Sequence, residues 1–208
     1  MARSDTAVVT DVRITLPDDW WMVPLQPTQA RERSVQRLVE RQFAGIDHQP
    51  QLREQVRKEV LAQADAAAVS DARILALSMQ RVDGLPVPAS LVVHWIDIPT
   101  GSNGADGSLL AALQDEFTPG PTSPAGVALD LAQMPAGTVL RRVLEAPAQF
   151  GGADPLPALV SDYWLERPDG AGLVQLAFST PMVAFRGQML ELFDAIAGAL
   201  RWVTDGES

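Results

Sequence analysis

The chain has 208 residues, of which 47% are hydrophobic and 20% charged, and its formal net charge is −10. This length allows one large domain or two small ones with a self-sufficient core. The ordinary globular composition excludes global disorder, a collagen-like repeat and a disulfide scaffold. Because cysteine is absent, thiol nucleophiles, cysteine-ligated zinc and iron–sulfur clusters are excluded too. The acidic net charge argues against general affinity for nucleic acid or anionic membranes.

The charge is distributed unevenly along the chain. Residues 29–61 carry seven basic and five acidic side chains, a net charge of +2, whereas residues 102–208 carry five basic and thirteen acidic ones, a net charge of −8. Either the two segments neutralise each other within one domain, or the basic segment presents a surface to something acidic.

The N-terminal region has no targeting signal that we can identify. The apolar run of residues 7–16 is interrupted by Asp11 and Arg13, so it is not a signal-peptide core. No stretch approaches the roughly 18 uninterrupted apolar residues of a membrane-spanning helix. We therefore expect a cytoplasmic protein whose ends, residues 1–5 and 204–208, are frayed.

Hydrophobic periodicity predicts the secondary structure. Alternating apolar and polar residues indicate strands, recurrence every three to four residues indicates helices, and glycine, proline and aspartate mark the turns. The expected elements, in chain order, are a strand at 11–16, helices at 28–45 and 50–68, strands at 74–80 and 90–98, a short helix at 108–117, strands at 127–131, 138–144, 158–166 and 173–178, and a final helix from Pro181 through Leu200 to Trp202.

The final helix is the clearest of these elements. Thr180 can cap it, Pro181 suits its first position, and the apolar stripe from Phe185 to Leu200 must lie on something apolar, most simply the sheet. No long linker divides the chain. We therefore predict that residues 1–208 form a single α+β domain, with an antiparallel sheet of about six to seven strands flanked by helices and the C-terminal helix packed on it.

The two histidines are the first candidates for chemistry. His48 lies in the link between the first two helices, where an exposed loop residue is expected. His94 shares a strand face with Val92 and Ile96, and is either a buried base with a shifted pKa or a core histidine with satisfied hydrogen bonds. Catalysis at His94 requires a carboxylate or hydroxyl within hydrogen-bond reach. Since no Gly-x-Ser-x-Gly nucleophile elbow is present, we expect no catalytic residue and no enzyme.

Other chemical signals are weak. Asp162 and Glu166 point to the same side of a predicted strand but lie about 13 Å apart, too far for a carboxylate pair acting on one bond. The tract Gly101–Gly107 has a phosphate-loop composition without the Lys-Ser/Thr ending, and lacks the acidic spacing of a calcium loop. We therefore expect no metal and no cofactor. The loops at 101–107, 118–126 and 147–157 are where recognition would most easily lie.

Arg33, Arg37 and Arg41 recur every four residues and place three like charges along one side of the first helix. They form either a solvated face paired with acids of the same protein or a docking stripe for an acidic protein, and the lack of interleaved aromatics argues against nucleic acid. Trp20 and Trp21 are neighbours. Either one enters the core and the other anchors an interface, or both pack under a loop or helix.

Two short segments carry a family resemblance. Leu16-Pro17-Asp18-Asp19-Trp20 resembles the Leu-Pro-x-x-Trp entry of PsbP-like proteins, whose relatives include an extrinsic photosystem II subunit, a Ran-binding nuclear import factor and bacterial lipoproteins. The segment 176–181 and the helix after it are similar to the closing element of that family. The paired helices between residues 28 and 68 depart from its shorter insertions. The resemblance implies a helix-flanked antiparallel sheet used mainly for binding, and it transfers no catalytic residue.

The element order is also similar to that of the START-like helix-grip fold, and the chain as a whole resembles actinobacterial proteins. Helix-grip proteins enclose a hydrophobic ligand between the sheet and the last helix, and the short helix at 108–117 would be an addition to that plan. This likeness implies a lipophilic small-molecule ligand.

These observations lead to three functional hypotheses. The first is a non-catalytic cytoplasmic interaction or accessory protein that docks another protein, or a second copy of itself, through the arginine-bearing helices or the Trp20-Trp21 edge. The second is a START-like binder of a lipophilic small molecule. The third is an enzyme that uses His94. Neither nucleic acid nor a membrane is expected as a partner.

Overall fold

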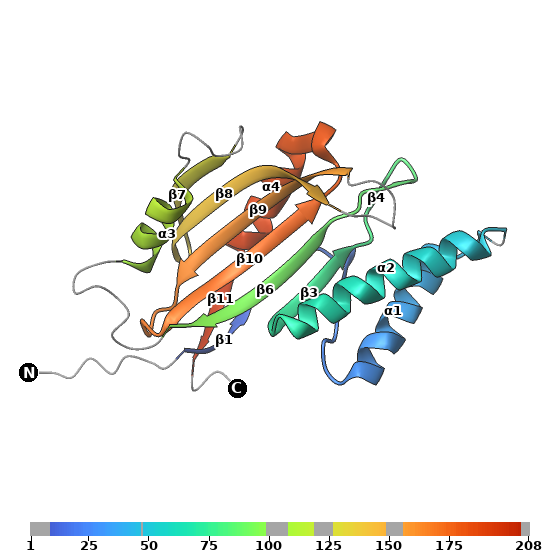
Figure 1. Ribbon diagram of the computed structural model, residues 1–208, viewed down its shortest axis with the longest axis horizontal. Coiled ribbons are helices and arrows are strands. Elements are labelled where there is room, and N and C mark those ends of the chain that lie inside the picture. Colours follow the sequence, from blue (N-terminus) through green and yellow to red (C-terminus); the bar gives the residue numbers. More distant parts are fainter. Residues whose placement is uncertain (1–8, 47, 99–107, 119–126, 149–155, 205–208) are drawn as a thin grey trace, which may run out of the picture.

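Seven strands form an antiparallel sheet in the order β2-β3-β6-β10-β9-β8-β7 (Figure 1). In that order their bounds are Trp20–Val23, Ala72–Ser78, Ser90–Asp97, Gly172–Thr180, Leu156–Glu166, Gly137–Ala148 and Ala128–Met134. The computed structural model describes residues 9–46, 48–98, 108–118, 127–148 and 156–204. Within these residues, the strands predicted at 74–80 and 90–98 form the antiparallel pair β3–β6, and those predicted at 158–166 and 173–178 form the pair β9–β10. The strands predicted at 127–131 and 138–144 form a further antiparallel pair, β7–β8.

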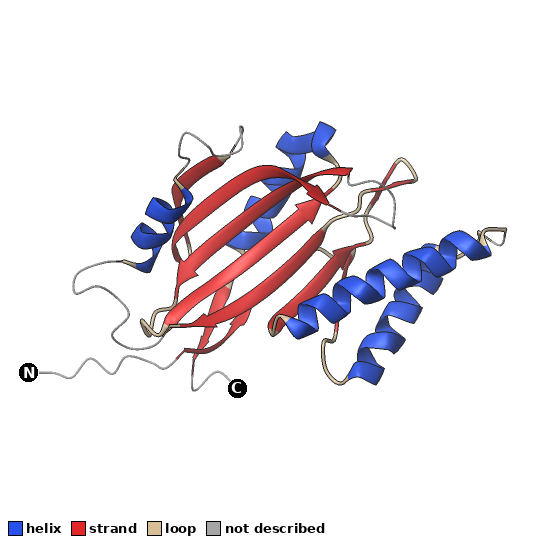
Figure 2. Ribbon diagram, in the orientation of Figure 1, coloured by secondary structure: helices blue, strands red, loops and turns tan. Residues whose placement is uncertain are grey.

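Helices cover both faces of the sheet, which confirms the predicted α+β class (Figure 2). They are α1 (Thr28–Gln42), α2 (Pro50–Val69), α3 (Leu109–Phe117) and α4 (Arg186–Gly198), the last preceded by the short 3₁₀ helix η1 (Val183–Phe185). In α1 the apolar residues Val35, Leu38 and Val39 are buried, because their spacing places them on one side of the helix. Ser108 caps α3 by accepting a hydrogen bond from the Ala111 amide at 3.4 Å.

The ends of the chain differ from the prediction. The last helix starts at Arg186 instead of Pro181, because β10 continues to Thr180 and η1 precedes the helix. It ends at Gly198, because Arg201–Thr204 form a strand. Trp202 lies in β11 (Arg201–Thr204), which pairs with β1 (Val9–Arg13) in a separate two-stranded ribbon. The predicted first strand therefore pairs outside the main sheet. Thr204, expected to be frayed, is the last residue of β11.

A small hairpin, β4 (Arg81–Val82) with β5 (Leu85–Pro86), turns at Asp83-Gly84, residues of the types that mark turns. It projects from the connection between β3 and β6 (Figure 1).

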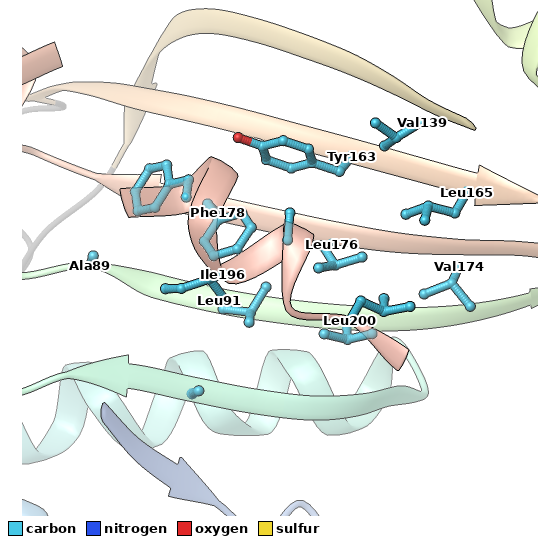
Figure 3. Packing of buried hydrophobic residues seen from close by; sticks show 14 of the residues in the cluster. Ala89, Leu91, Val139, Tyr163, Leu165, Val174, Leu176, Phe178, Ile196 and Leu200 are labelled. Carbon is cyan, nitrogen blue, oxygen red and sulfur yellow. The ribbon is translucent and has the colours of Figure 1, made fainter. Parts of the chain in front are cut away.

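The face of the sheet beneath α4 carries the largest part of the core. Phe178 on β10 stacks on Phe193 of α4 with ring centroids 4.6 Å apart, and Tyr163 packs edge-on to Phe178 at 5.6 Å. Leu176, Ile196 and Leu200 complete this packing (Figure 3). Side chains of the sheet and α4 thus pack directly against each other on this face.

The opposite face is covered in two separate places. At the β2–β3 side, α1 and α2 pack on Leu75 and Leu77. At the other side, α3 packs on Leu140 and Trp164. Figure 1 looks onto this face, with α1 and α2 beside β3 and α3 near β7 and β8. Between the two helical covers lies a strip that crosses the central strands β6, β10, β9 and β8.

Candidate functional site

Trp20 and Trp21 point to opposite faces of β2, as their adjacency predicts. Trp20 is 8% exposed and packs in the core beneath α4, edge-on to Phe178 at 6.5 Å. Trp21 is half-buried, and its indole N–H donates to the Ser34 hydroxyl of α1 at 2.9 Å. Neither ring stands free on the surface. The outer surface beside Trp21 is formed by α1.

Arg33, Arg37 and Arg41 lie on the exposed side of α1. Arg33 donates to the backbone and side-chain oxygens of Gln29, each at 3.2 Å. The guanidinium carbon of Arg41 lies 6.0 Å from the centroid of the Trp21 ring, a distance at which cation–π attraction is weak but favourable. Arg37 makes no hydrogen bond or ion pair with any residue that the structure describes.

Two acids share this exposed face. Glu32 and Glu40 lie beside the arginine row, and the Gln36 amide donates to the Glu40 carboxylate at 2.7 Å. Neither glutamate forms an ion pair with Arg33, Arg37 or Arg41 among the described residues. Three arginines against two glutamates leave the face with a formal charge of +1.

A groove of about 380 Å³ runs beside Arg33 and Arg37. It is lined by Pro24, Ala30, Arg33, Gln36 and Arg37. Pro24 and Ala30 supply apolar surface, while the two guanidinium groups and the amide can donate hydrogen bonds. The groove is therefore suited to a segment that combines apolar and acidic side chains.

Each of the other ion pairs in the described structure stays within one of two parts of the molecule. One part is the helical half, α1 and α2, and the other is the acidic half, the sheet with its turns and α4. In the helical half, Arg31 pairs with Asp65 at 2.7 Å, and Arg57 and Lys58 pair with Glu54. The remaining pairs join residues of the sheet, its turns and α4. No ion pair in the described ranges connects α1 or α2 with the acidic half, so the two halves do not neutralise each other by direct contact.

His94 lies on the strip between the helical covers and contacts a hydroxyl. Its Nε2 lies 3.0 Å from the oxygen of Ser70, which follows the last residue of α2. Burial lowers the pKa of His94 below its ordinary value of 6.5, and the nearby Asp71 carboxylate offsets part of this shift. This shift favours the neutral form of the imidazole. Its Nδ1 is buried and has no hydrogen-bond partner among the residues that the structure describes.

The Ser70–His94 contact is poorly arranged for acyl transfer. The Ser70 hydroxyl donates its single proton to the Ala67 carbonyl at 3.0 Å. Its oxygen can then only accept from His94 Nε2, so the imidazole does not act as a base toward this hydroxyl. Ser70 also lies at the C-terminal end of α2. The free backbone groups at this end of a helix are carbonyls, whereas an oxyanion is stabilised by amides.

A polar row that sequence reasoning did not assemble accompanies His94 on the same strip. It consists of Arg142 on β8, Asp162 on β9, Gln175 on β10 and His94 on β6. Asp162 and Gln175 stand among mostly apolar residues of their strands, and this was the signal that the sequence offered. Their meeting depends on the order β8-β9-β10-β6, which local periodicity does not reveal.

The remaining sequence candidates have simpler roles. Glu166, expected to be remote from Asp162, holds α3 by accepting from the Ser108 hydroxyl at 2.5 Å and the Leu110 amide at 3.0 Å. His48 is exposed in the α1–α2 link. The tract Gly101–Gly107 lies outside the described residues. Among those described, no cluster of three or more potential metal ligands occurs, and no helix is long and apolar enough to cross a membrane.

Comparisons with protein-family models, curated proteins and solved structures found no match to this chain. The PsbP-like and helix-grip resemblances therefore remain predictions.

Proposed function

We propose that this protein is a non-catalytic interaction protein that uses the exposed face of α1 to bind an acidic segment of another protein. The observation that carries the proposal is the distribution of ion pairs. Arg33, Arg37 and Arg41 lack acidic partners in the described structure, although the chain carries ten more acidic than basic residues. An arginine row that the protein's own acids leave unpaired is available to an acidic ligand.

The groove beside the row favours a peptide segment over a diffuse electrostatic contact. Pro24 and Ala30 offer apolar contact next to Arg33 and Arg37, and a docked segment would place acidic side chains within reach of both guanidinium groups. Glu32 and Glu40 on the same face would repel a segment in other registers, which gives the surface selectivity.

The test uses tagged full-length protein and host lysate. A captured partner is purified, its acidic segment is identified by crosslinking to α1, and the dissociation constant is measured at two salt concentrations. We expect Arg37→Glu to weaken binding about 10-fold, because reversal removes an attraction and adds a repulsion. Binding should also weaken at high salt.

Arg13→Glu is the matched control, since Arg13 is also exposed, has no ion pair in the described structure and produces the same change in net charge. It should leave the dissociation constant unchanged. Sedimentation of the protein alone shows whether the acidic partner is a second copy, in which case Arg37→Glu abolishes the self-association. Recovery of a monomeric protein without any partner, or binding that is indifferent to Arg33, Arg37 and Arg41, would overturn the proposal.

A further inference from the structure

The strand β7 forms one open edge of the seven-stranded sheet (Figure 1). It pairs with β8 on one side, and no described element pairs with its other side. The opposite edge is β2, which has only four residues and is flanked by Pro17 and Pro24. Short strands and prolines are devices by which proteins keep a sheet edge from pairing with another chain. The seven residues of β7 include no proline, so this edge has neither device.

The register of the β7–β8 hairpin shows which backbone groups of β7 point outward. The last residue of β7 pairs with Gly137 across a two-residue turn, so these two residues exchange both of their backbone hydrogen bonds. This role alternates along an antiparallel pair, so the N–H and C=O groups of Leu129, Leu131 and Gln133 point away from β8. None of these groups has a hydrogen-bond partner among the described residues. They offer a continuous row of donors and acceptors to a further strand.

The side chains of β7 do not protect this edge. Leu131 stands at its centre and is 50% exposed. The single charged residue of the strand is Asp130, and its carboxylate accepts from Arg141 Nε at 3.1 Å. Free charges on an edge strand discourage pairing, but this charge is already compensated. The edge therefore presents an exposed apolar residue and no unpaired charge.

The sequence of β7 suits pairing with a second copy of itself. A two-fold axis at Leu131 places this residue opposite Leu131 of the second copy and Leu129 opposite Gln133, so every outward backbone group finds a partner. Asp130 then lies opposite Ala132, and no like charges meet. An axis at Asp130 would instead set two carboxylates opposite each other, which is unfavourable. An axis at Ala132 would leave the first residues of β7 unpaired.

The helices leave room for the second copy. On one face α3 packs on Leu140 of β8 and Trp164 of β9, and on the other face α4 packs on β9 and β10. Both helices thus lie over inner strands of the sheet. A two-fold axis perpendicular to the sheet sets the two α3 helices on the same face, on either side of the paired β7 strands. The two Leu131 side chains then lie beside each other and are shielded from water.

From these observations we propose that the protein forms a symmetric dimer in which the β7 strands of two copies pair antiparallel, with Leu131 at the two-fold axis and one sheet continuous through both copies. This interface is separate from the arginine row on α1, and the two interactions respond oppositely to salt. Each copy carries a net charge of −10, so salt screens the repulsion between copies and tightens the β7 dimer. Binding of an acidic segment to α1 weakens instead.

The first experiment is sedimentation of the full-length protein over a range of concentrations, at about 0.05 and 0.5 M sodium chloride. We expect a dimer whose dissociation constant is lower at the higher salt concentration. Leu131→Lys should raise this constant at least about 10-fold, because it sets two ammonium groups opposite each other. Leu156→Lys on β9 is the matched control, since Leu156 is 48% exposed and the charge change is the same. It should leave the dissociation constant unchanged.

Amide hydrogen exchange of the wild-type protein locates the interface without any variant. The outward amides of Leu129, Leu131 and Gln133 should exchange about 10-fold more slowly at concentrations where the dimer dominates than where the monomer does. The amides of Asp130 and Ala132 bond to β8 in either state, so their exchange should change much less.

Three results would overturn the proposal. They are a monomer at all concentrations up to about 1 mM, a dimer that Leu131→Lys leaves intact, and exchange of the outward amides that is unchanged on dimerisation. Protection of these amides only by a different captured protein would also overturn it, because the edge would then serve another chain. A dimer that Arg37→Glu dissociates and Leu131→Lys does not would support the α1 surface against the β7 edge, so the two proposals fail separately.

Discussion

Gly172 brings the backbone of β10 against that of β6 at the edge of the strip. A Cβ atom on this residue would lie 1.9 Å from the carbonyl oxygen of Ile96 and 3.0 Å from its carbonyl carbon. Both atoms belong to the backbone of a central strand, so a flexible side chain cannot relieve the contact. Only glycine therefore fits in this space. Gly172 and Asp97 form the first pair of the β10–β6 ladder.

We expect Gly172→Ala to lower the free energy of unfolding by about 2 to 3 kcal/mol, because the added methyl overpacks a site bounded by backbone. Urea unfolding at constant slope measures the change. Gly187→Ala in α4 is the control, since its Cβ would meet no atom within 4 Å, and it should be neutral or stabilising by up to about 1 kcal/mol. Equal midpoints for Gly172→Ala and the wild type would show that β6 and β10 separate here without cost.

The helix α1 illustrates what periodicity predicts and what it misses. The spacing of Val35 and Leu38 is enough to place them inside and Arg37 outside, because a helical period fixes which residues share a side. It gave no warning that Arg31 is also buried, at 7% exposure. Its Nε donates to Asp65 of α2 at 2.7 Å and its Nη1 donates to the Leu25 carbonyl beyond β2. These partners come from other elements, which a local pattern does not contain.

The predicted bounds of the last helix were wrong because the residues at both ends have partners in other elements. Thr180 and Pro181 have the composition of a helix start, but Thr180 is the last residue of β10 and pairs with Leu159 of β9. Its hydroxyl accepts from the Met182 amide at 3.1 Å and so holds the turn before η1 instead of the start of α4. At the other end, Trp202 continues the apolar pattern, yet its indole N–H donates to the Ala136 carbonyl at 2.8 Å and its strand pairs with β1. Tertiary partners thus overrode the local helix signal at both ends.

Arg31 should therefore behave unlike its neighbours on α1. We expect Arg31→Met to lower the free energy of unfolding by about 1 to 3 kcal/mol, since the buried Leu25 carbonyl loses a donor. The half-exposed Asp65 carboxylate returns to water and adds little. Arg37→Met, which removes the same charge from the exposed side, should change stability by no more than about 0.5 kcal/mol. Thermal unfolding of both variants at one pH gives the comparison, and similar losses would contradict this division of α1.

At the scale of the whole molecule, one sheet contributes residues to three hydrophobic clusters. Leu75 belongs to the cluster under α1 and α2, while Ala76, next to it on β3, belongs to the cluster under α4. Trp164 and Leu165 divide in the same way between α3 and α4. Alternation predicted most of the strands, but the candidate polar row was not predicted, because it requires β6 and β8 to lie on either side of the β9–β10 hairpin.

Sharing the sheet should make unfolding cooperative. We expect Leu38→Ala in α1 to lower the free energy of unfolding by about 2 to 5 kcal/mol, and Phe193→Ala in α4 to lower it by about 3 to 5 kcal/mol. Each variant should keep a single unfolding transition, because loss of the helices on one face exposes strands on which the helices of the other face also pack. Far-UV circular dichroism reports the sheet, and tryptophan fluorescence reports the clusters, since Trp20, Trp21 and Trp164 each lie in or against a different one. Coincident curves from the two probes are the expected result. If Leu38→Ala instead gives an early fluorescence change with the sheet signal retained, then α1 and α2 form a unit that detaches from the sheet, and the α1 docking face would be mobile relative to the strip.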